Sequence, residues 1–206
     1  MSEGETLIFV IEVIAVLACA FSGFAEAQRK DMDLVGVYVV AFLTAFGGGT
    51  LRDVLLDRRP FFWVEHEQYP IIVLAMTLVG APMLRLVQRF IPNPAFVAAD
   101  AVGLAFFSIS GVAIALDSGM SPFVASMMGV VTGVFGGVLR DVLLNEVPLV
   151  LRDGRPYAIA AFLGCWLYLL MVHAGSTPGL ALWTAAAVTT GFRLLAWRYD
   201  WSIKDR

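Results

Sequence analysis

Seven apolar segments run along this chain, each about as long as a membrane-crossing helix. A helix needs ~20 apolar residues to cross a bilayer core about 30 Å thick. The interruptions are either charged, as at residues 28–31, or rich in proline and glycine, which end helices. The pattern therefore predicts seven transmembrane helices, at residues 6–27, 34–57, 69–88, 95–116, 121–144, 157–174 and 179–197.

The composition is typical of an integral membrane protein. Of the 206 residues, 59% are hydrophobic and 15% are charged, and the mean hydropathy is +0.81. A soluble domain has about 25% charged residues. The acidic residues before the first segment do not resemble the basic start of a secretory signal, so we expect that segment to be retained. The expected fold is an all-α polytopic membrane protein, with a single domain over residues 1–206. The net charge of −3 argues against nucleic-acid binding.

Positive charges indicate the orientation, because cytoplasmic loops carry an excess of Lys and Arg. With the N-terminus outside, ten such residues fall on the inner side, and only Arg58 and Arg59 fall on the outer side. The inner ones are Arg29, Lys30, Arg85, Arg89, Arg152, Arg155, Arg193, Arg198, Lys204 and Arg206. We therefore expect the N-terminus outside and the C-terminus in the cytoplasm.

A motif in the second segment returns 88 positions later in the fifth. Residues 48–56 read GGTLRDVLL, and residues 136–144 read GGVLRDVLL. At the same offset Glu12 matches Asp100, and Ser22 matches Ser110. Because one such unit holds three spans, the second copy would enter from the opposite side of the membrane. We expect two inverted three-helix repeats, at residues 6–90 and 94–174, followed by a seventh helix at residues 179–197.

Glycines cluster within the second and fifth spans. They are Gly47, Gly48, Gly49, Gly136 and Gly137. Each weakens a helix by roughly 1 kcal/mol relative to alanine, and irregular backbone is tolerated at membrane depth only against protein or a water-filled cavity. We therefore expect helices two and five to be kinked there. Thr50 would then cap a second half-helix, with Asp53 at its third position.

An Arg-Asp pair follows each glycine cluster, as Arg52-Asp53 and Arg140-Asp141. A charge at the bilayer centre costs at least ~2.5–3.5 kcal/mol, so such residues normally face a partner or an aqueous path. In one hypothesis the four charges line a shared polar cavity between spans two and five and form a pore or gate. In the other, each arginine pairs with a carboxylate and each aspartate caps its helix, which would only lock the kinks.

Four further polar residues lie in the first and fourth spans. Glu12 and Asp100 would lie toward opposite faces of the membrane. They would either attract cations at the two mouths or form salt bridges with the two arginines. Ser22 and Ser110 lie deeper in their spans and are either hydroxyl ligands of a passing ion or elements of packing and bending.

Catalytic and metal-binding patterns are missing from the sequence. The loops contain no nucleophile–base arrangement, phosphate-binding loop or metal-ligand spacing, and His66 and His173 lack neighbouring ligand types. We therefore expect no enzyme activity, no cofactor and no resident metal.

The doubled glycine and Arg-Asp motif, in this seven-span arrangement, resembles the trimeric intracellular cation channel family in its bacterial and archaeal branch. Members are also filed as an uncharacterised family and as a "glycine transporter" domain. The resemblance covers nearly the whole chain and implies a homotrimer among the lipids of a prokaryotic inner membrane. It also implies one hourglass pore per protomer, lined by kinked helices two and five, through which monovalent cations, chiefly potassium, would pass.

The resemblance puts the kinks at the five glycines named above, and the polar constriction around Arg52, Asp53, Arg140 and Asp141. Phe135 stands where the second glycine triplet would begin, so the two gates would not be equivalent. The Lys-Glu-Val signature of the animal members is missing at the kinks, so their calcium-store physiology does not transfer.

Three functions are compatible with these patterns. A passive, potassium-selective cation channel is favoured by the doubled kink and by the carboxylates toward both ends. A secondary transporter of a small solute such as glycine would use the same inverted repeats and broken helices. A structural scaffold would leave four buried charges without a purpose.

Overall fold

The computed structural model describes residues 3–87, 93–152 and 156–201, and all regular structure in these ranges is helical. The helices are α1 (Glu3–Arg29), α2 (Leu34–Leu55), α3 (Phe62–Glu65), α4 (Gln68–Val87), α5 (Asn93–Asp117), α6 (Pro122–Leu143), α7 (Leu149–Arg152), α8 (Ala158–His173) and α9 (Pro178–Arg198). Every expected span coincides with a long helix, whereas the short helices α3 and α7 occupy two of the loops. The expected ends at residues 88 and 90 lie outside the described residues, as do Arg89, Arg155, Lys204 and Arg206.

Five of the described helices are long and apolar enough to cross a membrane. They are Thr6–Arg29, Leu34–Leu55, Pro94–Asp117, Pro122–Leu143 and Pro178–Arg198. Two further apolar stretches are shorter, Gln68–Gly80 in α4 and Ala158–His173 in α8. The described ranges are therefore α-helical and contain the long apolar helices that a polytopic membrane protein requires.

Side-chain caps explain where several helices begin. The carboxylate of Asp33 accepts a hydrogen bond from the backbone at the start of α2, and the hydroxyls of Ser121 and Thr177 do the same for α6 and α9. Pro122 and Pro178 occupy the first positions of the latter two helices. A proline is tolerated there because the N–H that it lacks has no partner within the helix.

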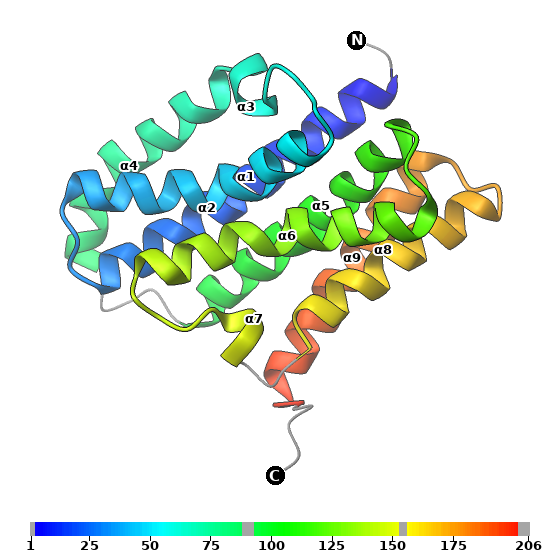
Figure 1. Cartoon of the computed structure of the whole chain (residues 1–206). Helices are drawn as coiled ribbons and strands as arrows, with labels where there is room; N and C mark the ends of the chain where they lie inside the picture. The colour runs from blue at the N-terminus through cyan, green and yellow to red at the C-terminus, as the bar shows by residue number, and fades with distance from the viewer. Residues whose placement is uncertain (1–2, 88–92, 153–155, 202–206) are drawn as a thin grey trace.

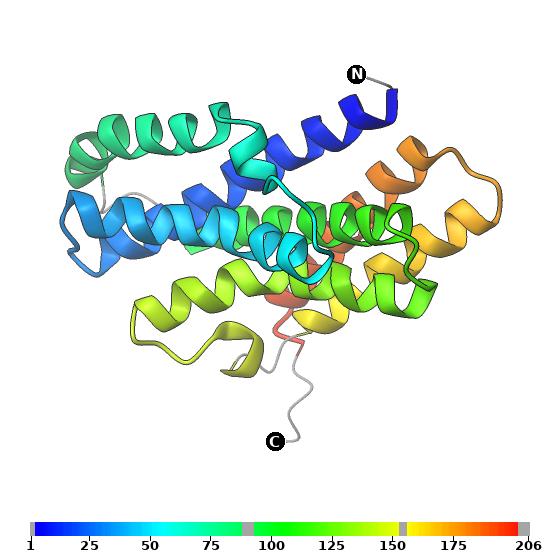
Figure 2. The same ribbon diagram turned by 45° about the horizontal axis from the view of Figure 1, so that its top comes forward.

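Helices α1, α2, α5 and α6 form the centre of the molecule, where α1 packs against α2 and α5, and α6 packs against α2 and α5. Helix α4 covers α1 and α2, while α8 covers α5 and α6 in the corresponding way. Figures 1 and 2 show α4 at one edge and α8 with α9 at the other. Helix α9 packs mainly against α5 and α8, which both belong to the second half of the chain.

The backbones of α2 and α6 touch where they cross. A methyl group added to Gly48 would overlap the carbonyl oxygen of Thr132, and one added to Gly136 would overlap that of Thr44. The pairing of residue 48 with 132, and of 44 with 136, shows that the two helices run antiparallel through this contact. These glycines are therefore needed for the close approach of two backbones.

Helix α2 continues without interruption through its glycine triplet, and α6 does so through Gly136 and Gly137. Thr50 lies inside α2, where its hydroxyl donates to the carbonyl of Phe46 at 2.7 Å. The expectation that Thr50 caps a second half-helix is therefore wrong. Close packing of α2 on α6 holds the glycines helical despite their low propensity, because tertiary contacts override local preference.

Candidate functional site

The first buried charge cluster surrounds Arg52, whose side chain is fully inaccessible to solvent. Its Nε donates to Asp53 Oδ1 at 2.8 Å, and its Nη1 donates to Glu12 Oε1 at 3.1 Å. The other carboxylate oxygen of Asp53 accepts from the backbone N–H of Phe62 at 2.9 Å. Because Phe62 begins α3, this carboxylate joins the end of α2 to the loop that follows it.

The second cluster surrounds Arg140 and repeats this construction in α6. Its Nε donates to Asp141 Oδ1 at 2.8 Å, and its Nη1 donates to Asp100 Oδ1 at 2.7 Å. Asp141 Oδ2 accepts from the backbone N–H of Leu149, the first residue of α7, at 2.7 Å. In addition, Nη1 donates to the hydroxyl of Ser22 in α1 at 2.6 Å.

Each guanidinium also lies against an aromatic ring, and the two rings come from different places in the chain. The guanidinium carbon of Arg52 is 5.2 Å from the ring centroid of Phe62, and that of Arg140 is 5.0 Å from the centroid of Phe96. These are cation–π distances, so each ring adds an attractive contact to the guanidinium. Pairing with two carboxylates and one ring explains how an arginine remains charged while buried.

With both carboxylates ionised, each cluster carries one net negative charge. One amino group of each arginine, Nη2, is buried without a hydrogen-bond partner. An unused donor on a buried guanidinium is uncommon, because burial of an unpaired polar group costs free energy. Each arginine can therefore accept a new partner through Nη2 before it releases an existing one.

The two clusters lie on opposite sides of the α2–α6 crossing. Arg52 follows Gly48, and Arg140 follows Gly136, each by one helical turn, and the two helices run in opposite directions there. With a rise of 1.5 Å per residue, each arginine lies about 6 Å beyond its glycine along the helix. In this structure the backbone contact separates two clusters that each face their own partners, and a shared polar cavity between the two spans stays a prediction.

The structure brings together seven of the eight polar residues that the sequence singled out. The first cluster contains Glu12, Arg52 and Asp53, and the second contains Ser22, Asp100, Arg140 and Asp141. Glu12 forms a salt bridge with Arg52, and Asp100 forms one with Arg140. The salt-bridge alternative for these two carboxylates therefore applies.

Ser110 is the exception. Its hydroxyl donates to the carbonyl of Phe107 at 3.3 Å within the same helix, although its repeat equivalent Ser22 contacts an arginine. The sequence also gave no indication of the rings of Phe62 and Phe96.

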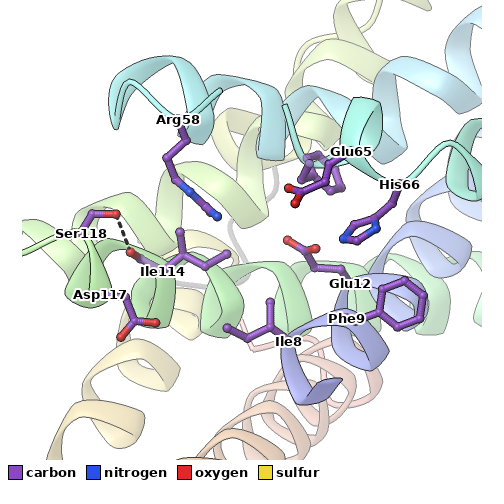
Figure 3. Close-up of a pocket in the computed structure, with 10 residues that line it drawn as sticks. Ile8, Phe9, Glu12, Arg58, Glu65, His66, Ile114, Asp117 and Ser118 are labelled. Carbon is purple, nitrogen blue, oxygen red and sulfur yellow. Dashed lines mark hydrogen bonds between the residues drawn. The ribbon is translucent and has the colours of Figure 1, made fainter. Parts of the chain in front are cut away.

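A cavity of about 560 Å³ opens beside the Arg52 cluster. Figure 3 shows the carboxylates of Glu12 and Glu65 pointing toward each other inside it, with Arg58 on one side and His66 on the other. Asp117, at the end of α5, lines the opposite wall. This cavity reaches from the surface to Glu12, the carboxylate that holds Arg52, and is named the outer cavity because its residues fall on the expected outer side.

A smaller hollow lies beside the Arg140 cluster among the described residues. The hollow lined by Gly137, Arg140, Asp141 and Tyr157 has no room for a water molecule. Among the described residues, the two clusters are therefore alike in bonding and differ in the size of the hollow beside each.

Sequence comparison finds the same segment type twice in the chain. The family model described as "Glycine transporter" matches residues 9–85 and again residues 97–173, and the second range begins 88 residues after the first. The chain is 35% identical to the "UPF0126 inner membrane protein YadS" of Escherichia coli, over 96% of this chain and 94% of that protein. It is 37% identical to a "UPF0126 membrane protein" of Vibrio cholerae, over 96% of this chain and 82% of that protein.

Comparison of structures leads to cation channels. The chain superposes with a TM-score of 0.86 on the TRIC trimeric intracellular cation channel orthologue from Rhodobacter sphaeroides, with 32% sequence identity, covering 95% of this chain and 100% of that one. A second structure of TRIC cation channels gives a TM-score of 0.85 at 32% identity, covering 96% of both chains. These similar structures are ion channels and not enzymes, which agrees with the expected lack of catalysis. The chain therefore belongs to the trimeric intracellular cation channel family, as an integral membrane protein of the group whose family model is described as "Glycine transporter".

Proposed function

We propose that this protein is a monovalent cation channel selective for potassium, with one pore per protomer between α2 and α6. The observation that carries the proposal is the pair of carboxylate-rich arginine clusters on opposite sides of the α2–α6 crossing. A cation following these helices would meet one net negative cluster, the crossing, and then the other cluster. The resemblance to solved cation channels supports this function.

The crossing itself would be the gate. Where Gly48 and Gly136 meet the opposing backbone, no side chain stands between the helices, so a small separation there changes the width of the path. Glycine is the residue that bends most readily within a helix. We infer that α2 and α6 kink at Gly47–Gly49 and at Gly136 and Gly137 when the path opens.

In this proposal Arg52 and Arg140 are latches on either side of the gate. Each arginine holds a carboxylate of its own helix and one of the neighbouring helix, α1 or α5. The unused Nη2 donors would allow the guanidinium to change partners as the helices move. Because two carboxylates accompany each guanidinium, the clusters would not repel a passing cation.

We further propose two inverted repeats, 6–90 and 94–174, with the N-terminus outside. The repeated family match and the corresponding packing of α4 and α8 support the repeat. Lys30, Glu146 and Arg152 gather at one end of the molecule, and all three fall on the expected cytoplasmic side. A homotrimer embedded in membrane lipids follows from the trimeric state of the similar channel.

A transporter of a small solute such as glycine is the second candidate, because the matching family model carries that description. It would use the same inverted repeats, with access alternating between the two sides. At the crossing Gly48 and Gly136 lie against backbone atoms of the opposing helix and offer no side chains of their own to bind a solute, which favours the channel.

Electrical and flux measurements separate the two candidates. We expect purified protein in planar bilayers to show single-channel currents whose reversal potential follows the potassium gradient. Saturable glycine counterflow in liposomes, without resolvable current, would overturn the channel proposal.

The latch role has its own test. Arg140→Ala is expected to change conductance or open probability while trimers still form, as judged by size-exclusion chromatography. Arg152→Ala, which removes an exposed arginine of the same half, is the matched control and should leave currents unchanged. Normal currents from Arg140→Ala would reduce the Arg-Asp pair to a structural element.

A further inference from the structure

The turns that end α2 and α6 have the same backbone geometry. The N–H of Arg58 donates to the carbonyl of Asp53 at 2.8 Å, after a residue with φ of 52°. The N–H of Glu146 donates to the carbonyl of Asp141 at 2.8 Å, after a residue with φ of 57°. A left-handed residue and a bond back to the last turn form a common helix ending. Residues 58 and 146 therefore occupy equivalent places next to the two arginine clusters.

These equivalent places carry opposite charges. Glu146 is bound by Lys30 Nζ at 2.5 Å and by Arg152 Nη1 at 3.1 Å, so its charge is compensated by two neighbours. Arg58 instead extends into the outer cavity, where its Nη1 lies 3.8 Å from Asp53 Oδ1. Figure 3 shows the Arg58 side chain directed toward the interior of that cavity.

The outer cavity is otherwise acidic. Glu12, Glu65 and Asp117 contribute three carboxylates. Among the described residues that line the cavity, Arg58 is the only arginine, and no lysine is present. Its side chain is 43% exposed and is held only by a long ion-pair contact, so it has room to move. A guanidinium in an acidic, water-accessible cavity occupies the position that a mobile cation would otherwise take.

We infer that Arg58 is a tethered cation that competes with permeating cations for the outer cavity, so that cations enter more slowly from this mouth than from the cytoplasmic one. The inference rests on the proposed channel function. Arg58 would thereby control the asymmetry of the current, a role that Arg52 and Arg140 cannot fill because both side chains are buried.

Patch recordings from cells that express the full protein test this inference, because the orientation there is that of the cell membrane. Arg58→Gln is expected to raise the current that enters from the outer side roughly threefold relative to the reverse current, in about 0.1 M KCl. The gain should shrink in about 1 M KCl, where charges are screened over about 3 Å. Arg58→Lys keeps the charge and should keep the asymmetry.

Arg59→Gln is the matched control, since it removes the same charge from the adjacent residue. Arg59 lies over the ring of Phe61, 4.1 Å from its centroid, and does not line the outer cavity. An equal effect of Arg59→Gln, or a gain that persists at high salt, would overturn the role of Arg58 while the channel function stands. Absence of any current from the unmodified protein would overturn both.

Discussion

At the scale of single residues, Arg52 and Arg140 are each held by a carboxylate from the next position and one from 40 positions earlier. Arg52 Nη1 donates to Glu12 Oε1 at 3.1 Å, and Arg140 Nη1 donates to Asp100 Oδ1 at 2.7 Å. Each guanidinium keeps its other carboxylate when one is removed, so the loss is that of one charge-assisted hydrogen bond, worth about 1.5–3 kcal/mol.

The first prediction concerns this long-range partner. Glu12→Gln is expected to destabilise the protein by roughly 1.5–3 kcal/mol, which lowers its melting temperature by roughly 5 °C. Thermal unfolding in detergent, followed by circular dichroism, measures the change. Glu65→Gln, which alters the same cavity without contacting Arg52, serves as the control and should have little effect.

The two serines give a second prediction, because they are repeat equivalents with different contacts. Ser22 accepts a bond from Arg140 at 2.6 Å, while Ser110 bonds only within its own helix. Ser22→Ala is therefore expected to cost about 1–3 kcal/mol, and Ser110→Ala less than about 1 kcal/mol. Equal losses in thermal unfolding would contradict this difference.

At the scale of helices, the antiparallel contact between α2 and α6 determines where the two arginine clusters lie relative to each other. Both helices carry their arginine one turn beyond the glycine that makes the contact. Because the helices are antiparallel there, the same local motif is directed toward opposite ends of the molecule. Two similar motifs thus become two separate clusters.

The third prediction is that this contact tolerates no side chain. Gly48→Ala and Gly136→Ala would each place a methyl group on a backbone carbonyl that cannot move aside cheaply, so each should destabilise the fold by about 1–3 kcal/mol or more. Gly191→Ala, in α9, is the control because an added methyl group meets nothing within 4 Å. There alanine should be neutral or stabilising by up to about 1 kcal/mol. Loss of stability only at Gly191 would exclude the close contact.

At the scale of the whole molecule, Lys30 and Glu146 join the two halves of the chain. Their side chains meet at 2.5 Å between the loop after α1 and the loop after α6. The hydrogen bond from Lys30, together with its charge, holds the pKa of the Glu146 carboxyl below its ordinary value of 4.5. Both groups are exposed, so salt weakens the interaction.

The fourth prediction follows from the sign of this shift. A carboxyl whose pKa is lower in the folded protein stabilises it above the ordinary pKa, and this contribution is lost as the pH falls through the folded value. The difference in melting temperature between the unmodified protein and Lys30→Gln should therefore be present at neutral pH and disappear in acid below about pH 4.5. A difference that grows on acidification would contradict the assignment.

Much of this architecture could be predicted from sequence because it depends on local pattern. Apolar segments long enough to cross a bilayer mark the long helices, since burial in lipid requires them to be continuous. The offset of 88 residues identified Glu12 with Asp100 and Arg52 with Arg140 as corresponding residues. The salt bridges from Glu12 and Asp100 to the arginines could thus be predicted as one of two alternative roles for these carboxylates.

Only the tertiary structure decided which side chains meet. The continuous course of α2 through its glycines, the separation of the two clusters and the different contacts of Ser22 and Ser110 depend on how helices rotate and cross. Such relations join residues as far apart as Ser22 and Arg140, and no local pattern specifies them. Helix formation follows from nearby residues, whereas partner choice follows from packing between distant ones.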